Sequence, residues 1–340
     1  MKTTAFLRLC TSLGAAFFVA QHANAAAAPV STLTVKIEEW NTADGAHPHD
    51  PEIAADGSAW YAAERENVVG HLDPKTGTAK NYTAPTTRSN PHSLVADKAG
   101  NIWYTAGGAA LIGKLEPATG KFTEYKMPDP VARDPHALIF DRKGMLWFTV
   151  QSGNAYGRID PATGKVDLKI YPTARALPYG IVVDSKDIPY FSLYGTNKIA
   201  RIDPATLATT ELELPAAARP RKIAITPNDI LWYADYDRGV LGRVDPKTKQ
   251  VREFPTPGGS AAKPYGIIAT ADGVWLSESG VTPNTLLFFD PAAEKFQSWT
   301  IPSGGGTIRH MVASPDGRTL WLACSDLGKM ARVTITRAGK

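Results

Sequence analysis

Histidines recur at a regular spacing along this chain. The position that opens a repeated segment, directly after a proline, carries a ring-bearing or basic residue in successive segments: His49, His92, His136, Tyr179, Arg221, Tyr265 and, without its proline, His310. Imidazole can act as a general base or bind a metal ion, and phenol and guanidinium groups can hold polar ligands. Side chains gathered around one opening would form a functional mouth. The same spacing is also expected if each ring simply packs on its neighbour.

Carboxylates form a second candidate set. Glu64, Asp235 and Glu278 follow the aromatic residue of a predicted strand in three segments. Carboxylate oxygens and imidazole nitrogens together are typical ligands of Mg²⁺, Ca²⁺, Mn²⁺ or Zn²⁺. We therefore predict Glu64 and Glu278 as metal ligands and rank Asp50 and Glu52 below Glu64. A solvated or arginine-paired carboxylate is the alternative for each.

Arg221 is the one cationic residue in the set of seven, and it lies beside Arg219 and Lys222. A guanidinium group facing the mouth would suit a carboxylate, phosphate or enolate oxygen. The alternative is that Arg221 pairs with Asp235 within the same repeat. The sequence holds no nucleophile elbow, no phosphate-binding loop and no dinucleotide fingerprint after a strand.

The elements that must position these residues repeat along the chain. An acidic residue followed by proline recurs at steps of 42 to 45 residues: Asp73-Pro74, Glu116-Pro117, Asp160-Pro161, Asp203-Pro204, Asp245-Pro246 and Asp290-Pro291. Each repeat contains four short strand patterns, and turns such as Pro161–Gly164 join the third and fourth strands. Four short strands in about 40 to 45 residues are typical of one propeller blade.

The strand patterns near the two ends of the chain together make up one blade. Six full repeats precede a seventh that stops after its third strand, Met330–Thr334. The segment Thr32–Trp40 has the pattern of a fourth strand without the preceding three. Pairing the two fragments would close a ring and remove an exposed sheet edge. We predict an all-β, seven-bladed β-propeller over residues 32–338, as a single domain whose last blade is closed by an N-terminal strand.

The N-terminal residues and the composition indicate the compartment and the kinds of partner. Residues 1–25 resemble a secretory signal peptide, with basic residues, an apolar run and a small-residue site ending at Ala25. This predicts a periplasmic or secreted protein that has no membrane segment after cleavage. Cys324 would then be the single remaining cysteine, expected as an inert buried thiol. A formal net charge of +4 without a basic tract gives no support for nucleic-acid binding.

The blade motifs resemble a known family. Pro178–Ile181, Pro264–Ile267, Leu146–Thr149 and Gly157–Asp160 are similar to the repeats of the streptogramin B (virginiamycin B) lyase family. The resemblance implies ring opening of a cyclic depsipeptide by elimination, assisted by Mg²⁺. It also implies His310 as the catalytic histidine. Ile308, Ser325 and Tyr265 stand where that family has acidic or histidine residues.

Three functions follow from these observations. The first is a carbon-oxygen lyase that opens cyclic esters, with His310 as the base and a divalent metal at the mouth. The second is a non-catalytic propeller that binds a small molecule, a cyclic peptide or a protein partner through the ring of His, Tyr and Arg side chains. The third is a gluconolactonase-like, metal-dependent lactone hydrolase. In each case a monomer is expected.

Overall fold

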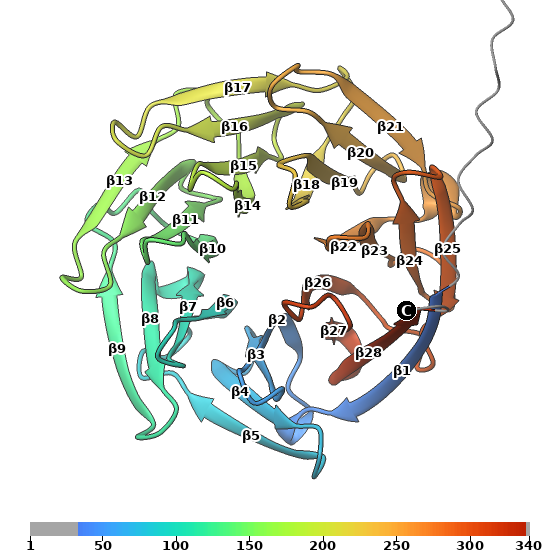
Figure 1. The fold of residues 1–340 in the computed structure, drawn as a ribbon. Coiled ribbons are helices and arrows are strands. Elements are labelled where there is room, and N and C mark those ends of the chain that lie inside the picture. The colour runs from blue at the N-terminus through green and yellow to red at the C-terminus, as the bar shows by residue number, and fades with distance from the viewer. Residues whose placement is uncertain (1–32, 338–340) are drawn as a thin grey trace, which may run out of the picture.

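Seven four-stranded antiparallel sheets form a closed ring in the computed structural model, which describes residues 33–337 (Figure 1). The predicted seven-bladed propeller is confirmed. Blades one to three comprise β2 (Pro48–Ile53), β3 (Ala59–Ala63), β4 (Val68–Asp73), β5 (Thr78–Thr83), β6 (Pro91–Ala96), β7 (Ile102–Ala106), β8 (Leu111–Glu116), β9 (Lys121–Lys126), β10 (Pro135–Phe140), β11 (Leu146–Val150), β12 (Ala155–Ile159) and β13 (Val166–Ile170).

The remaining blades follow in the same order. Blades four to six comprise β14 (Pro178–Val183), β15 (Pro189–Leu193), β16 (Lys198–Ile202), β17 (Thr209–Glu213), β18 (Pro220–Ile225), β19 (Leu231–Asp235), β20 (Val240–Val244), β21 (Val251–Pro255), β22 (Pro264–Ala269), β23 (Val274–Glu278), β24 (Thr285–Asp290) and β25 (Lys295–Thr300). Blade seven comprises β26 (Ile308–Ala313), β27 (Thr319–Cys324), β28 (Lys329–Arg337) and β1 (Leu33–Asn41). The described helices are single 3₁₀ turns: Ala43–Gly45, Gly107–Ala109, Gly259–Ala261 and Ser325–Leu327.

The recurring acid-proline pair begins the turn between the third and fourth strands of a blade. In the turn after β12, Asp160 Oδ1 accepts a hydrogen bond from Ala162 N at 2.9 Å, and Gly164 N donates to Asp160 O at 2.8 Å. Gly164 has a φ of +72°, a conformation that glycine adopts without steric cost. The acid-proline pair follows the third strand in six blades, and this explains why the repeat period is visible in the sequence.

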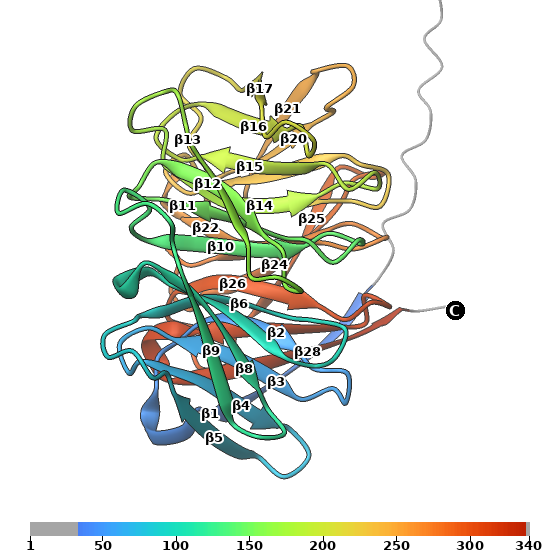
Figure 2. The same cartoon turned by 90° about the vertical axis from the view of Figure 1, so that its left-hand side faces the viewer.

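The ring is closed by the two ends of the chain, as predicted. β1 pairs antiparallel with β28 over nine residue pairs, from Leu33 with Arg337 to Asn41 with Lys329. Figure 1 shows β1 in blue beside β28 in dark red, and Figure 2 shows the strands running across the thickness of the ring. The predicted signal peptide at residues 1–25 lies outside the described residues and stays a prediction.

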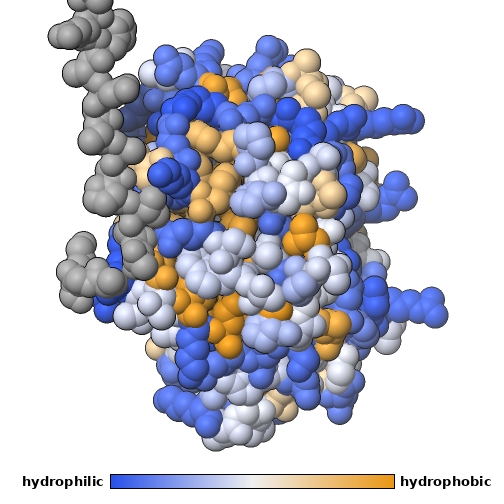
Figure 3. All heavy atoms as spheres, turned by 90° about the vertical axis from the view of Figure 1, so that its right-hand side faces the viewer, coloured by the Kyte–Doolittle hydropathy of each residue, from blue (hydrophilic) through white to orange (hydrophobic). Residues whose placement is uncertain are grey.

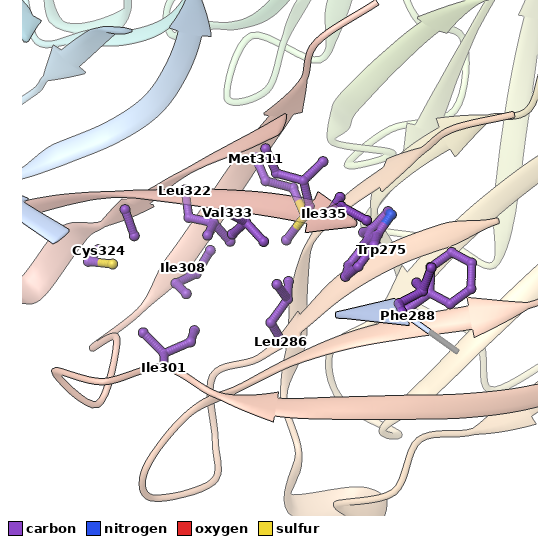
Figure 4. Close-up of a cluster of buried hydrophobic side chains, with 13 residues drawn as sticks. Trp275, Leu286, Phe288, Ile301, Ile308, Met311, Leu322, Cys324, Val333 and Ile335 are labelled. Carbon is purple, nitrogen blue, oxygen red and sulfur yellow. The ribbon is translucent and has the colours of Figure 1, made fainter. Parts of the chain in front are cut away.

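Apolar clusters lie between neighbouring blades. Figure 4 shows the cluster between blades six and seven, in which Trp275 and Phe288 of blade six belong to the same cluster as Met311 and Ile335 of blade seven. Cys324 lies in the same cluster with no exposed surface, and burial raises the pKa of its thiol to about 12. The thiol is therefore protonated and inert at neutral pH, as the sequence predicted.

The outer surface is mostly polar. On the side shown in Figure 3, hydrophilic residues predominate and the hydrophobic ones form small separate patches. Among residues 33–337, the exposed large hydrophobic side chains are Val131, Ile170 and Leu327. No helix within the described part of the chain has the length and apolar character needed to cross a membrane.

Candidate functional site: the propeller channel

The predicted ring residues of blades one to four lie in contact around the central channel. The ring centroids are 3.8 Å apart for His49 and His92, 4.0 Å for His92 and His136, and 3.9 Å for His136 and Tyr179. All four side chains are more than nine-tenths buried. Each comes from the start of an inner strand, β2, β6, β10 or β14. These four rings therefore pack on one another, as one interpretation of the spacing expects, and their role as a functional mouth stays a prediction.

On the opposite side of the ring, Arg221 lies among tyrosine side chains. Its guanidinium carbon lies 4.1 Å from the ring centroid of Tyr265, 4.7 Å from that of Tyr236 and 5.2 Å from that of Tyr194. Arg221 Nε also donates to the hydroxyl of Tyr179 at 3.3 Å. Burial raises the pKa of Tyr179 well above its ordinary value, and the contact with the Tyr265 hydroxyl adds to this effect. These contacts hold a cation on aromatic faces.

The alternative pairing of Arg221 with Asp235 is wrong. Asp235 Oδ2 accepts hydrogen bonds from Arg219 N at 2.9 Å and from Arg238 Nε at 2.8 Å. Arg238 lies in the turn after β19, three residues from Asp235, and reaches the carboxylate locally. Asp235 therefore anchors the rim of blade five.

His310 lies one position further along its strand than the spacing suggested. Ile308 pairs with Cys324 as Pro48 pairs with Ala63, so Ile308 occupies the position of the opening proline. Arg309 is then the blade-seven member of the ring, and His310 occupies the next position. The prediction of His310 as the ring residue of blade seven is therefore wrong by one position. Blade seven lacks the proline that marks the register in the other blades.

This second position holds three ionisable side chains and four small residues. Around the ring, starting from blade one, it is occupied by Asp50, Ser93, Ala137, Gly180, Lys222, Gly266 and His310. Glycine, alanine and serine leave space that the longer polar side chains can enter. The register therefore places an acid, an ammonium group and an imidazole within one channel.

Asp50 and Lys222 form a buried ion pair across the channel. Lys222 Nζ of blade five lies 3.1 Å from Asp50 Oδ2 of blade one, and both residues are at most 3% exposed. His49 Nδ1 donates to Asp50 Oδ1 at 2.9 Å. Burial by itself would raise the pKa of Asp50, but the ammonium of Lys222, the neighbouring imidazoles and the hydrogen bond from His49 together outweigh burial and hold that pKa well below its ordinary value. The carboxylate is thus charged and fully paired.

His310 is a neutral imidazole beside this pair. Burial, followed by the positive charge of Lys222, lowers the pKa of His310 to about 4. Its Nδ1 atom is buried and has no hydrogen-bond partner among the described residues. A buried polar atom without a partner is costly and uncommon. His310 is therefore unprotonated at neutral pH, and one of its ring nitrogens has no partner among the described residues.

The two predicted metal ligands lie in different surroundings. Glu64 lines a hollow of about 40 Å³ at the mouth together with His49 and Arg309, and burial raises its pKa. Glu278 is buried within blade six, where its oxygens accept hydrogen bonds from Gly258 N at 2.7 Å and Thr285 Oγ1 at 2.6 Å. The structure therefore brings Glu64 to the mouth and leaves Glu278 in the rim. Metal binding by either residue stays a prediction.

The channel donors do not fit Mg²⁺. Among the described residues, the ligand atoms of His49, Asp50 and His92 lie within 4.8 Å of one another, as a metal site would require. Mg²⁺ prefers oxygen ligands in octahedral geometry. The cluster offers one carboxylate, and both of its oxygens are already bonded to His49 and Lys222.

Two residues of this network were under-ranked from the sequence. Asp50 was placed below Glu64, and Lys222 was noted only as a neighbour of Arg221. The signal was present at the position after the ring residue, where Asp, Lys and His replace residues that are small in the other blades. Comparing that second position across the repeats would have found all three.

Acidification is expected to destabilise the folded protein. The pKa of His310 is about 4 against an ordinary value of 6.5, and burial also holds the pKa values of His92 and His136 well below theirs. As the pH falls below about 6.5, the unfolded chain takes up protons that the folded chain does not. Glu52, whose pKa burial raises to about 7, acts in the opposite direction, and so do Glu64 and Asp134. These are three groups against four, because the pKa of His71 is lowered as well. The urea midpoint should fall between neutral pH and pH 4, and a constant or rising midpoint would contradict these assignments.

Comparisons with known proteins agree with this architecture. The sequence matches the virginiamycin B lyase family over residues 10–284. A streptogramin B lyase structure is 26% identical, with a TM-score of 0.77, and the match covers 89% of this chain and 98% of that one. The selenomethionine-substituted virginiamycin B lyase from Staphylococcus aureus is 23% identical, with a TM-score of 0.79, and the match covers 88% of this chain and 99% of that one.

A third solved structure is a catalytically inactive histidine-to-alanine variant of the Staphylococcus aureus virginiamycin B lyase with quinupristin. It is 23% identical, with a TM-score of 0.79 and the same coverage. No curated protein sequence matches the chain. The family match extends over most of the chain but ends before β26, which carries His310. On this match and the fold, the chain belongs to the virginiamycin B lyase family.

Proposed function

We propose that this protein is a carbon-oxygen lyase that opens cyclic, depsipeptide-like esters by elimination, with His310 as the general base. The observation that carries the proposal is the neutral imidazole of His310, whose buried Nδ1 has no partner beside the Asp50–Lys222 pair. A base needs a free lone pair, and the depressed pKa keeps His310 unprotonated at neutral pH. Membership in the virginiamycin B lyase family supports the reaction class.

The reaction balances without water. The imidazole takes a proton from the carbon α to a carbonyl, and the negative charge develops on that carbonyl oxygen as an enolate. The electron pair then forms a carbon-carbon double bond while the bond from the β-carbon to the ester oxygen breaks, and a carboxylate leaves. Arg221 and Arg309 supply positive charge near the mouth, and such charge stabilises an enolate oxygen.

A binding propeller is the second candidate, and the packing of the ring favours it. The stacked side chains of His49, His92 and His136 leave at most 7% of each residue exposed. The hollow at the mouth is about 40 Å³, so a larger ligand would rest on the mouth rather than enter the channel. Under either function we propose a monomer acting in the periplasm or outside the cell, on the basis of the signal-like segment at residues 1–25.

The His310→Ala variant tests the proposed function. Loss of a general base should lower turnover of a cyclic ester by at least about 100-fold while the thermal midpoint stays near that of the parent. His71→Ala is the matched control, because His71 lies on β4 and bonds to Ser58 away from the channel. Assays should include streptogramin B and simpler cyclic esters, with products analysed in ¹⁸O water.

Three results would count against the proposal. Unchanged turnover in His310→Ala would remove His310 as the base. Incorporation of ¹⁸O into the product would favour the hydrolase, because elimination adds no solvent oxygen. No turnover by the parent on any ester, together with measurable binding of one, would favour the binding propeller.

A further inference from the structure

A lysine ammonium contacts the one carboxylate of the cluster in the channel that could hold a metal ion. The ligand atoms of His49, Asp50 and His92 converge within 4.8 Å of one another, and all three residues are buried. Lys222 Nζ enters this group from the opposite side of the ring and lies 3.1 Å from Asp50 Oδ2. The ammonium group therefore already supplies a cation to the carboxylate of the cluster.

The charge balance of the cluster excludes a second cation. Asp50 carries one negative charge, which the ammonium of Lys222 balances at hydrogen-bond distance. His49 and His92 are neutral donors to a metal and add no negative charge. A divalent ion bound here would lie a few ångströms from a buried ammonium, where repulsion is only weakly screened. The cluster can hold the lysine or a metal, but not both.

Lys222 is also fixed in this place by its surroundings. Its backbone lies in β18, and the Cα of Lys222 would lie 3.2 Å from a Cβ added at Gly180 on the neighbouring inner strand. The side chain is 3% exposed, so it has little freedom to turn out to solvent. Displacing it would leave a buried ammonium without its partner, which is strongly unfavourable.

We infer that the Lys222 ammonium is the resident cation of this channel, and that the His49–Asp50–His92 cluster binds a divalent metal only when Lys222 is removed. The position of the Lys222 ammonium follows from its contact with Asp50 and does not depend on the proposed function. The consequence for catalysis rests on the proposed function, in which Arg221 and Arg309, and not a metal in this cluster, supply the positive charge for the enolate. The lyase reaction should then proceed at an unchanged rate in the presence of a chelator.

Cobalt titration tests this inference without any substrate. Co²⁺ is a spectroscopic substitute for Zn²⁺ at sites of histidine and carboxylate ligands. The parent should show no saturable visible absorption on addition of Co²⁺, and calorimetry with Mg²⁺ and Zn²⁺ should detect no site in the channel. Lys222→Met should bind one equivalent of Co²⁺ at least about tenfold more tightly than the parent. Lys222→Met combined with His92→Ala should lose that site.

The outcomes separate this inference from the lyase proposal. One equivalent of tightly bound metal in the parent, lost in His49→Ala, would overturn the resident-cation inference whatever the activity. Equal cobalt affinity in the parent and in Lys222→Met would also overturn it. Lys222→Gln is measured in parallel in case the methionine variant does not fold, and the measurement on the parent needs no variant. An inactive parent that binds no metal would overturn the lyase proposal and support the resident cation.

Discussion

Removal of residues 33–41 is expected to abolish cooperative folding. This segment is β1, which pairs with β28 through nine residues and supplies the outer strand of blade seven. Its loss would expose the backbone edge of β28 and uncover apolar residues that Leu33, Val35 and Ile37 now cover. Because blade seven joins both ends of the chain, an unstable blade seven would open the ring.

Thermal unfolding followed by circular dichroism measures this effect. The truncated protein should show no cooperative transition, or should precipitate, under conditions in which the parent unfolds with a single sigmoidal curve. Lys36→Ala is the matched control, since the side chain of Lys36 is exposed on β1 and bonds to Glu38 of the same strand. A truncated protein that melts at the temperature of the parent would mean that the ring does not depend on this closure.

The fold was predictable because its determinants are local and repeated. In five of the turns after a third strand, an aspartate accepts a hydrogen bond from the backbone two residues later, as Asp160 does from Ala162, so the repeat is visible without any knowledge of the structure. The closing strand could be recognised as well, because Val35 and Ile37 alternate with polar residues and the seventh repeat lacked its last strand. Each step depended on residues close together in the sequence.

The site was predictable only in part, since its contacts join distant residues. The stacking of His49, His92 and His136 follows from their equal spacing, and the sequence found these residues. The Asp50–Lys222 pair joins residues 172 positions apart. Both residues occupy the second position of their repeats, but this shared position does not by itself show that the two side chains meet across the channel. Arg309 was overlooked for a related reason, because the absent proline in blade seven hid the register. Glu278 was chosen by residue type, which does not show that Gly258 and Thr285 occupy its oxygens.

A double-mutant cycle on Asp50 and Lys222 should give a large coupling free energy. Lys222→Met leaves the buried carboxylate of Asp50 without its ammonium, and Asp50→Asn leaves the buried ammonium without its carboxylate. Breaking a buried pair from one side costs about 3–5 kcal/mol of unfolding free energy. The double variant removes both charges and keeps similar shapes, so it should be destabilised by much less than the sum of the single changes.

Urea unfolding at neutral pH measures the four free energies of the cycle. The matched control is the Arg252–Glu294 pair, whose side chains are 55% and 41% exposed and which joins blades five and six at the surface. Its coupling should be at most about 1 kcal/mol, because water and salt screen exposed pairs. If the Asp50–Lys222 coupling were equally small, the pair would not be held in a buried channel. The same outcome would remove the main electrostatic reason for the low pKa of Asp50, since that shift requires a close, poorly screened ammonium.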